Sequence, residues 1–281
     1  MYIAKILNDK GLFQSIGGWI KVNPNIHPSF VDEFLFRACS VRLSIMRMDF
    51  LNGKCLYQFR KQKNELTIHD SRLTFWSPSL IEFLNETTPF LANMRIMQNS
   101  VIPLAILMSG LKQSVDSSLA DAIKKVESYG LTKKLSVAIK DYWENGGKQV
   151  VDYRDVDQHF STVVKHAYIQ IHSNKEELLV LIPDNPEVKS PKKFEFSTNR
   201  NALDYFRDSY FRLNKLVENM GKILGINPHS IDQPYDMNNV AIEDGVNKTL
   251  LLAIEDTTKF SGIEVGQTEE RKIYIRNLPL K

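Results

Sequence analysis

Apolar residues recur at steps of three and four along much of the chain, which is the spacing of one face of an α-helix. The first clear series begins after Pro28 and consists of Phe30, Phe34, Ala38, Val41, Ile45 and Met48. A proline in the first turn, followed by acidic Asp32 and Glu33, is typical of a helix start. The series therefore predicts a long buried helix. Further apolar residues on its other flank indicate that it packs against several neighbours; they are Leu35, Cys39 and Met46.

A second helical region begins at Pro78. Within it, Thr88 followed by Pro89 resembles an N-cap and a proline at the first helical position, which predicts that a new helix starts there. Apolar positions continue from Phe90 to Met108, and Pro103 should kink or restart the helix.

Three shorter helices are predicted next. Ser118, with Asp121 three residues later, resembles a capping box, and the helix that follows should stop at Gly130. Thr132 can cap another helix, which ends before the glycine pair at 146–147. A last helix containing residues 154–164 would complete a helical bundle.

The pattern then changes to alternating and continuous apolar runs. Residues 168–171 and 178–182 flank a polar turn at 173–176, which predicts a β-hairpin. A heptad series follows and ends at Gly225; its members are Leu203, Phe206, Tyr210, Leu213, Val217, Met220 and Leu224. This long helix could pack within the fold or pair with a second copy as a homodimer.

These elements predict a mainly α fold, a helical bundle with a small β-hairpin and an irregular C-terminal tail. We expect residues 1–185 to form the bundle with an N-terminal arm and the hairpin. Residues 186–281 would supply the long amphipathic helix and a tail that packs on the bundle. Two strands are predicted within the tail, at 249–254 and 272–275.

Composition places the chain among ordinary globular proteins, because 43% of its 281 residues are hydrophobic and 25% are charged. The net charge of +3 permits nucleic acid as a partner without indicating it. Cys39 and Cys55 are too few for a disulfide framework. The apolar run 101–111 is too short to span a bilayer, and the N-terminus has no signal-peptide pattern, so we expect a cytoplasmic protein with no membrane partner.

The densest chemistry lies at residues 153–159, where Arg154, Asp155 and His159 fall close together. A guanidinium near a helix start can hold a phosphate, and a histidine can move a proton near neutral pH. On a helix, Arg154 and His159 would differ by about 140° around the axis and would border one groove.

The spacing Arg154-Asp155-x-x-x-His159 resembles the R-x(4–6)-H motif of the HEPN (higher eukaryotes and prokaryotes nucleotide-binding) superfamily. The resemblance covers about residues 80–165 and implies an all-α bundle, many of whose members are metal-independent endoribonucleases in toxin–antitoxin and phage-defence systems. It implies that Arg154 binds the scissile phosphate and that His159 is the general base or acid. Asp155 would orient one of them, and the site would form across a two-fold dimer.

Two alternatives stay open from the sequence alone. Arg154 could pair with Asp155 or Asp157 while His159 is a satisfied interface histidine. The chain could also be a non-catalytic interaction protein that dimerises through its heptad helix. We expect no cofactor and no metal: neither GxGxxG nor GxxxxGK[ST] occurs, and His159, His166 and His172 do not form a clear ligand set.

Overall fold

The structure is a computed structural model that describes residues 28–66, 68–69, 72–73, 75–112, 115, 118–159, 162–164, 166–172, 175–226, 263–267 and 273–277. The predicted N-terminal arm and the strand at 249–254 lie outside these residues. The chain divides into two compact units, Met1–Ser230 and Ile231–Lys281. The long helix after the hairpin belongs to the first unit, so this division falls later than the boundary expected near residue 185.

The first unit is mainly helical, as the sequence predicted. Its α-helices are α3 (Pro28–Gln62), α4 (Pro78–Met108), α5 (Leu119–Ala122), α6 (Lys133–Tyr142), α7 (Lys148–His159) and α8 (Ala202–Ile223). Short 3-10 turns cover Ile123–Tyr129, Pro186–Val188 and Pro191–Lys193, and a wider π-type turn covers Trp143–Gly147. Its strands are β1 (Ile68–His69), β2 (Arg72–Leu73), β3 (His166–His172) and β4 (Lys175–Leu181).

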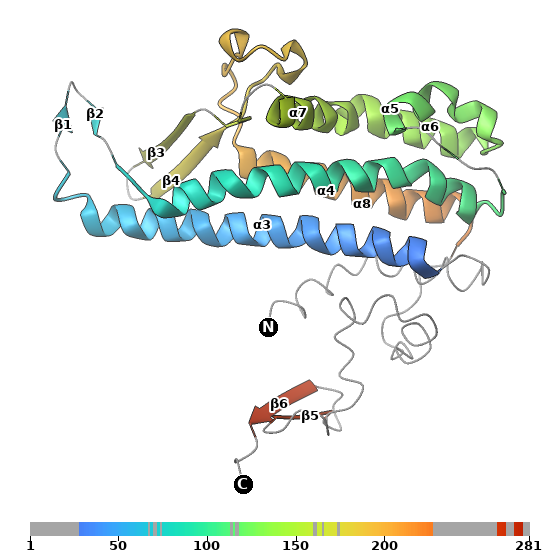
Figure 1. Cartoon of the computed structure of the whole chain (residues 1–281), viewed down its shortest axis with the longest axis horizontal. Coiled ribbons are helices and arrows are strands. Elements are labelled where there is room, and N and C mark those ends of the chain that lie inside the picture. Colours follow the sequence, from blue (N-terminus) through green and yellow to red (C-terminus); the bar gives the residue numbers. More distant parts are fainter. Residues whose placement is uncertain are drawn as a thin grey trace. The chain divides into compact units, whose positions relative to one another are not determined.

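Helix α4 is the centre of the bundle. Figure 1 shows α3 and α4 side by side, with α8 beside them and α5, α6 and α7 along the other side of α4. The side chains of α4 that face these neighbours are fully buried, including Phe90, Leu91, Met94, Met97 and Val101. Their burial supplies the main hydrophobic stabilisation of the fold.

The structure corrects the predicted helix start at Thr88. Helix α4 begins at an N-cap on Ser77, whose Oγ accepts a hydrogen bond from the Leu80 amide, and it continues without a break to Met108. Pro89 and Pro103 therefore lie inside the helix. Each proline removes one backbone hydrogen bond, but the apolar residues around them are buried against several neighbours, which outweighs that loss.

By length and composition, α4 is also the one helix among the described residues that could cross a membrane. The sequence predicted none. Within its most apolar window, 56% of the residues are buried inside the bundle, as the central position of the helix requires.

The long helix α8 confirms the heptad prediction. Asn201 caps it by accepting a hydrogen bond from the Leu203 amide, and Gly225 follows it with a left-handed φ of 69°. Most heptad side chains are buried in the bundle; they are Leu203, Phe206, Tyr210, Leu213, Val217 and Met220. Because this stripe is occupied within the chain, a dimer formed through it would require α8 to leave the bundle.

The predicted caps of the shorter helices and the predicted hairpin are confirmed, whereas the bounds of α7 differ from the prediction. Ser118 and Thr132 act as N-caps, and Gly130 ends its helix with a φ of 75°. Strands β3 and β4 form the predicted antiparallel hairpin, with Tyr168 opposite Leu179. The helix expected over 154–164 instead starts at Lys148 and ends at His159.

The second unit contains an antiparallel pair of strands among its described residues. They are β5 (Ile263–Gln267) and β6 (Ile273–Asn277), with Val265 opposite Ile275. Strand β6 overlaps the strand predicted at 272–275, whereas β5 was not predicted.

Candidate functional site

Helix α7 carries all three predicted site residues. Its inner face is formed by Val150, Tyr153 and Val156, which are buried, and this fixes which side chains can face outward. Tyr153 anchors the helix further because its hydroxyl donates a hydrogen bond to the Pro183 carbonyl. Arg154 and Asp155 are consequently half-buried at the edge of the bundle.

The start of α7 is fixed by a buried amide from α4. Gln98 donates hydrogen bonds from Nε2 to the Tyr142 hydroxyl at 2.9 Å and to the Gly147 carbonyl at 2.8 Å. Just before α7, Gly146 has a φ of 143°, which side chains rarely tolerate, and Arg212 donates a hydrogen bond to the Asn145 carbonyl. These contacts set the direction in which α7 leaves the wide turn.

Asp155 is the centre of a small charged cluster. Its two carboxylate oxygens accept hydrogen bonds from Arg154 Nη1 at 3.1 Å and from Lys189 Nζ at 3.1 Å. Burial alone would raise the pKa of Asp155, but the hydrogen bonds from Lys189 and Arg154 hold it below the usual value. Asp155 is therefore ionised at neutral pH and fixes the guanidinium of Arg154, one of the arrangements anticipated from the sequence.

Arg95 on α4 joins this cluster. Burial lowers the pKa of its guanidinium; the charge of Asp155 opposes that shift, while the charge of Arg154 adds to it. Arg95 Nη1 and Arg154 Nε are both buried and have no hydrogen-bond partner among the described residues. Each guanidinium group therefore has an unused hydrogen-bond donor, and the two positive charges repel each other. A bound anion would accept hydrogen bonds from these donors and reduce the repulsion.

The sequence reasoning missed Arg95, although a signal was present. Arg95 is the sole charged residue between Glu86 and Lys112. A single arginine within a long apolar helix has to find a polar surrounding when the helix is buried. Its partners could not be identified until α4 and α7 were placed together.

His159 occupies a different position from Arg154. It is the last residue of α7 and is exposed, whereas Arg154 is half-buried. Five residues of helix correspond to an axial rise of about 7.5 Å and a rotation of about 140°. The structure thus brings Arg154 and Asp155 together with Arg95 and Lys189, and it leaves His159 at the solvent-facing end of the same helix.

A hollow lies beside the first turns of α7. Its volume is about 320 Å³, and it is lined by Glu144, Asn145, Gly146, Lys148, Gln149, Asp152, Glu187 and Arg212. Burial raises the pKa of Asp152, while the nearby charges of Lys148 and Lys189 act in the opposite direction. This mixed lining of acids and bases favours neither a purely anionic nor a purely cationic ligand.

The histidines do not make a metal site in the part of the chain that is described, where no group of three or more His, Cys, Asp or Glu side chains could hold an ion. His166 instead packs edge-on against Phe196, with ring centroids 4.8 Å apart.

Asp155 should give the stability of the protein a specific pH dependence. A carboxyl group whose folded-state pKa lies below its unfolded value stabilises the fold above the unfolded pKa, and the effect is lost as pH falls through the folded pKa. Asp155→Asn should therefore be less stable than wild type at pH 7, and the difference should shrink below about pH 4. Urea unfolding of both proteins across this range measures it, and a difference independent of pH would contradict the assigned role.

Comparisons with known proteins give no further guide. No protein-family model, curated protein or solved structure matches this chain.

Proposed function

We propose that this protein binds a phosphate group of RNA or a nucleotide through Arg95 and Arg154, and that it cleaves bound RNA without a metal ion. The observation that carries the proposal is a pair of half-buried arginines, each with one buried donor that has no hydrogen-bond partner among the described residues: Nη1 of Arg95 and Nε of Arg154. Guanidinium groups bind phosphate oxygens with charge-assisted hydrogen bonds, which are the strongest kind available to neutral-pH proteins.

Asp155 has a positioning role in this proposal. It already accepts hydrogen bonds from Arg154 and Lys189, so it limits the rotation of the arginine side chain. A phosphate approaching the cluster would then meet donors whose directions are set beforehand, and less conformational entropy would be lost on binding.

His159 supplies the chemistry that the HEPN-like spacing implies. In the proposed reaction the ribose 2′-oxygen attacks phosphorus and the bond to the 5′-oxygen breaks, which leaves a 2′,3′-cyclic phosphate and a 5′-hydroxyl. His159 would accept the proton from the 2′-hydroxyl or donate one to the leaving 5′-oxygen, and water would make the other transfer. Arg154 would stabilise the charge that develops on the phosphate. The exposed position of His159 supports access to a long polymer.

RNA binding tests the arginine pair directly. Arg95→Ala and Arg154→Ala should each weaken binding of a short fluorescein-labelled single-stranded RNA by about ten-fold or more, because a charge-assisted hydrogen bond is lost. The dependence of affinity on salt should also become less steep by about one phosphate contact. Fluorescence anisotropy at several salt concentrations gives both values.

The matched control is Lys140→Ala. It also removes one positive charge, from a residue of α6 that forms an ion pair with Glu127. Its affinity for RNA should stay close to that of wild type. If all three variants bind alike, the attraction comes from overall charge and the cluster is not the site.

The alternative of a non-catalytic protein that dimerises through the heptad helix has weaker support, since the heptad stripe of α8 is buried within the chain.

A further inference from the structure

Helix α3 carries a second apolar series on the side away from the core. We define this outer stripe as Phe36, Cys39, Leu43, Met46, Phe50, Gly53 and Tyr57, which follow one another at alternating steps of three and four. The core series of the same helix includes Phe34, two residues before Phe36 and therefore about 200° away around the axis. Phe50 and Tyr57 are 61% and 55% exposed, and Phe36 and Leu43 are exposed as well.

The spacing of the outer stripe indicates what it can bind. Alternating steps of three and four define the narrow a/d seam through which one helix packs on another, whereas a helix lying in a membrane surface presents a broader apolar face. Gly53 has no neighbouring atom within 4 Å of the position where a Cβ would stand, so it leaves a hole in the seam that a partner side chain can fill.

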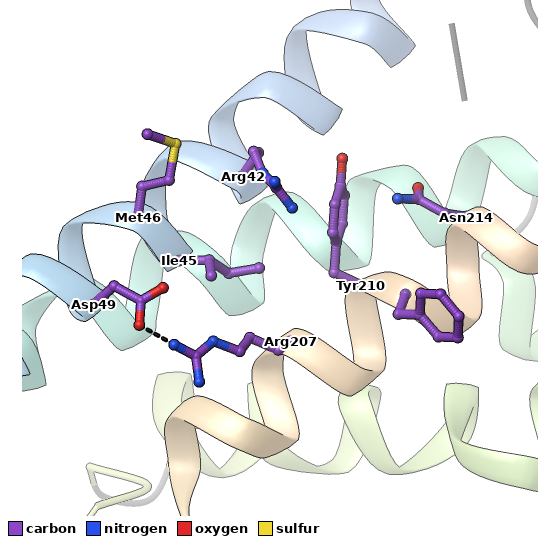
Figure 2. A pocket seen from close by; sticks show the side chains of 8 residues that line it. Arg42, Ile45, Met46, Asp49, Arg207, Tyr210 and Asn214 are labelled. Carbon is purple, nitrogen blue, oxygen red and sulfur yellow. Dashed lines mark hydrogen bonds and ion pairs between the residues drawn. The ribbon is translucent and has the colours of Figure 1, made fainter. Parts of the chain in front are cut away.

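A groove between α3 and α8 extends the outer stripe. Its volume is about 400 Å³, and Figure 2 shows Asp49 of α3 paired with Arg207 of α8 and Arg42 of α3 pointing toward Tyr210 of α8. Met46 of α3 also lines the groove. The remaining lining residues are Ile45, Phe211 and Asn214. Met46 belongs to both surfaces, so a helix lying on the stripe would also cover the groove.

Charge at this surface distinguishes between occupants. The basic residues of α3 are Arg37, Arg42, Arg47, Lys54, Arg60 and Lys61, of which Arg47 and Arg60 form ion pairs with Glu86 and Glu176. In the part of α3 whose side chains are described, Asp49 is the sole acid, and it forms an ion pair with Arg207. Arg42 Nε is buried without a hydrogen-bond partner among the described residues. A second copy of this surface would oppose like charges, whereas an acidic helix would complement them.

We propose that the outer stripe and the adjoining groove dock an acidic amphipathic α-helix of a partner protein. Its apolar residues would repeat at steps of three and four and pack between Leu43, Phe50 and Tyr57. Its carboxylates would lie along the flanks, where Arg42 and Lys54 can receive them. This surface is separate from the Arg95–Arg154 cluster, so the inference does not depend on the proposed RNA chemistry.

A designed peptide tests the inference on the full chain. The probe is a fluorescein-labelled four-heptad peptide with leucine at its core positions and glutamate at the flanking positions, and the comparison peptide carries lysine in place of glutamate. The glutamate peptide should bind, and the lysine peptide should bind at least about ten-fold more weakly, because its charges face the basic flanks. Anisotropy titrations measure both affinities.

Two variants locate the binding site. Phe50→Glu should weaken binding of the glutamate peptide by about ten-fold or more, because an aromatic contact is lost and a negative charge is placed opposite the glutamates of the peptide. Tyr57→Glu should act in the same direction. The matched control is Val137→Glu on α6, where the replaced side chain is also apolar and 56% exposed, and it should leave the affinity unchanged. Circular dichroism and thermal unfolding establish that each variant is folded.

Several results would overturn the proposal. Failure of the glutamate peptide to bind, equal binding of both peptides, or equal affinity in Phe50→Glu and Val137→Glu would each do so. Sedimentation velocity showing a wild-type dimer that Phe50→Glu dissociates would assign the surface to a second copy. Binding to vesicles rich in phosphatidylserine that Phe50→Glu abolishes would assign it to a membrane.

Discussion

Replacing His159 by alanine is expected to lower RNA cleavage in EDTA by at least about 100-fold, because a positioned general acid or base contributes about 10²–10⁴ to the rate. The side chain is exposed at the last residue of α7, so its removal should not disturb the core. EDTA is included because the proposed reaction uses only protein side chains. Cleavage of total RNA by equal amounts of wild type and variant, followed over time on a gel, gives the ratio of rates.

Arg154→Ala and Lys140→Ala complete this experiment. Arg154→Ala should lose cleavage to a similar degree, since the developing charge on the phosphate would no longer be stabilised. Lys140→Ala should cleave like wild type, because its charge lies in a surface ion pair with Glu127. Cleavage that persists unchanged in His159→Ala would show that another site or a contaminating nuclease is responsible. Binding without any cleavage by wild type would reduce the proposal to RNA recognition alone.

Replacing Phe206 by alanine should destabilise the protein by about 3–5 kcal/mol, which is the usual effect of removing a fully buried phenylalanine. Phe206 has no exposed surface and lies where α8 meets α4. Its ring is 4.4 Å from that of Phe90 and 6.0 Å from that of Tyr205, measured between centroids. The substitution therefore leaves a cavity at the junction of two central helices. Urea unfolding at neutral pH measures the change.

Phe211→Ala is the matched control because it makes the same substitution in the same helix. Phe211 is 58% exposed and contacts Lys215, whose Nζ lies 5.3 Å from the centre of the ring. Its loss should change stability by less than about 1 kcal/mol, since no cavity is created. Comparable losses in the two variants would mean that α8 does not pack through its heptad face.

The two predictions concern different properties of the molecule. Phe206 is fully buried, whereas His159 at the end of α7 is exposed. Replacing Phe206 therefore changes the free energy of unfolding. His159→Ala acts on a rate and should leave unfolding unchanged. Together they separate the support that the bundle gives from the chemistry proposed at its edge.

Local signals in the sequence predicted much of the secondary structure. The heptad series identified α8 because period and burial coincide along it, and Thr132 marked the start of α6 because a side-chain oxygen can satisfy an amide at a helix end. The hairpin was recognisable from two apolar runs separated by a short polar turn. In each case the deciding interaction is between residues close in sequence or belongs to one face of one element.

Other features depended on which elements meet. Thr88-Pro89 has the local form of a helix start, yet burial of the surrounding apolar residues keeps α4 continuous through Pro89. The end of α7 at His159 also differed from the prediction.

The candidate site also combines residues that local sequence indicated with residues that only the packing of the helices brought near them. The sequence indicated Arg154, Asp155 and His159 as chemically notable, and local spacing placed Arg154 beside Asp155. Only the packing of α4 against α7 brought Arg95 into the electrostatic neighbourhood of that pair, and only the loop after β4 supplied Lys189. The sequence predicted the buried series of α3, and the structure buries Phe34, Ala38, Val41, Ile45 and Met48 as expected. The other flank was expected to pack against neighbours, but the tertiary structure leaves Phe50 and Tyr57 exposed there, because burial depends on contacts between segments distant in the chain.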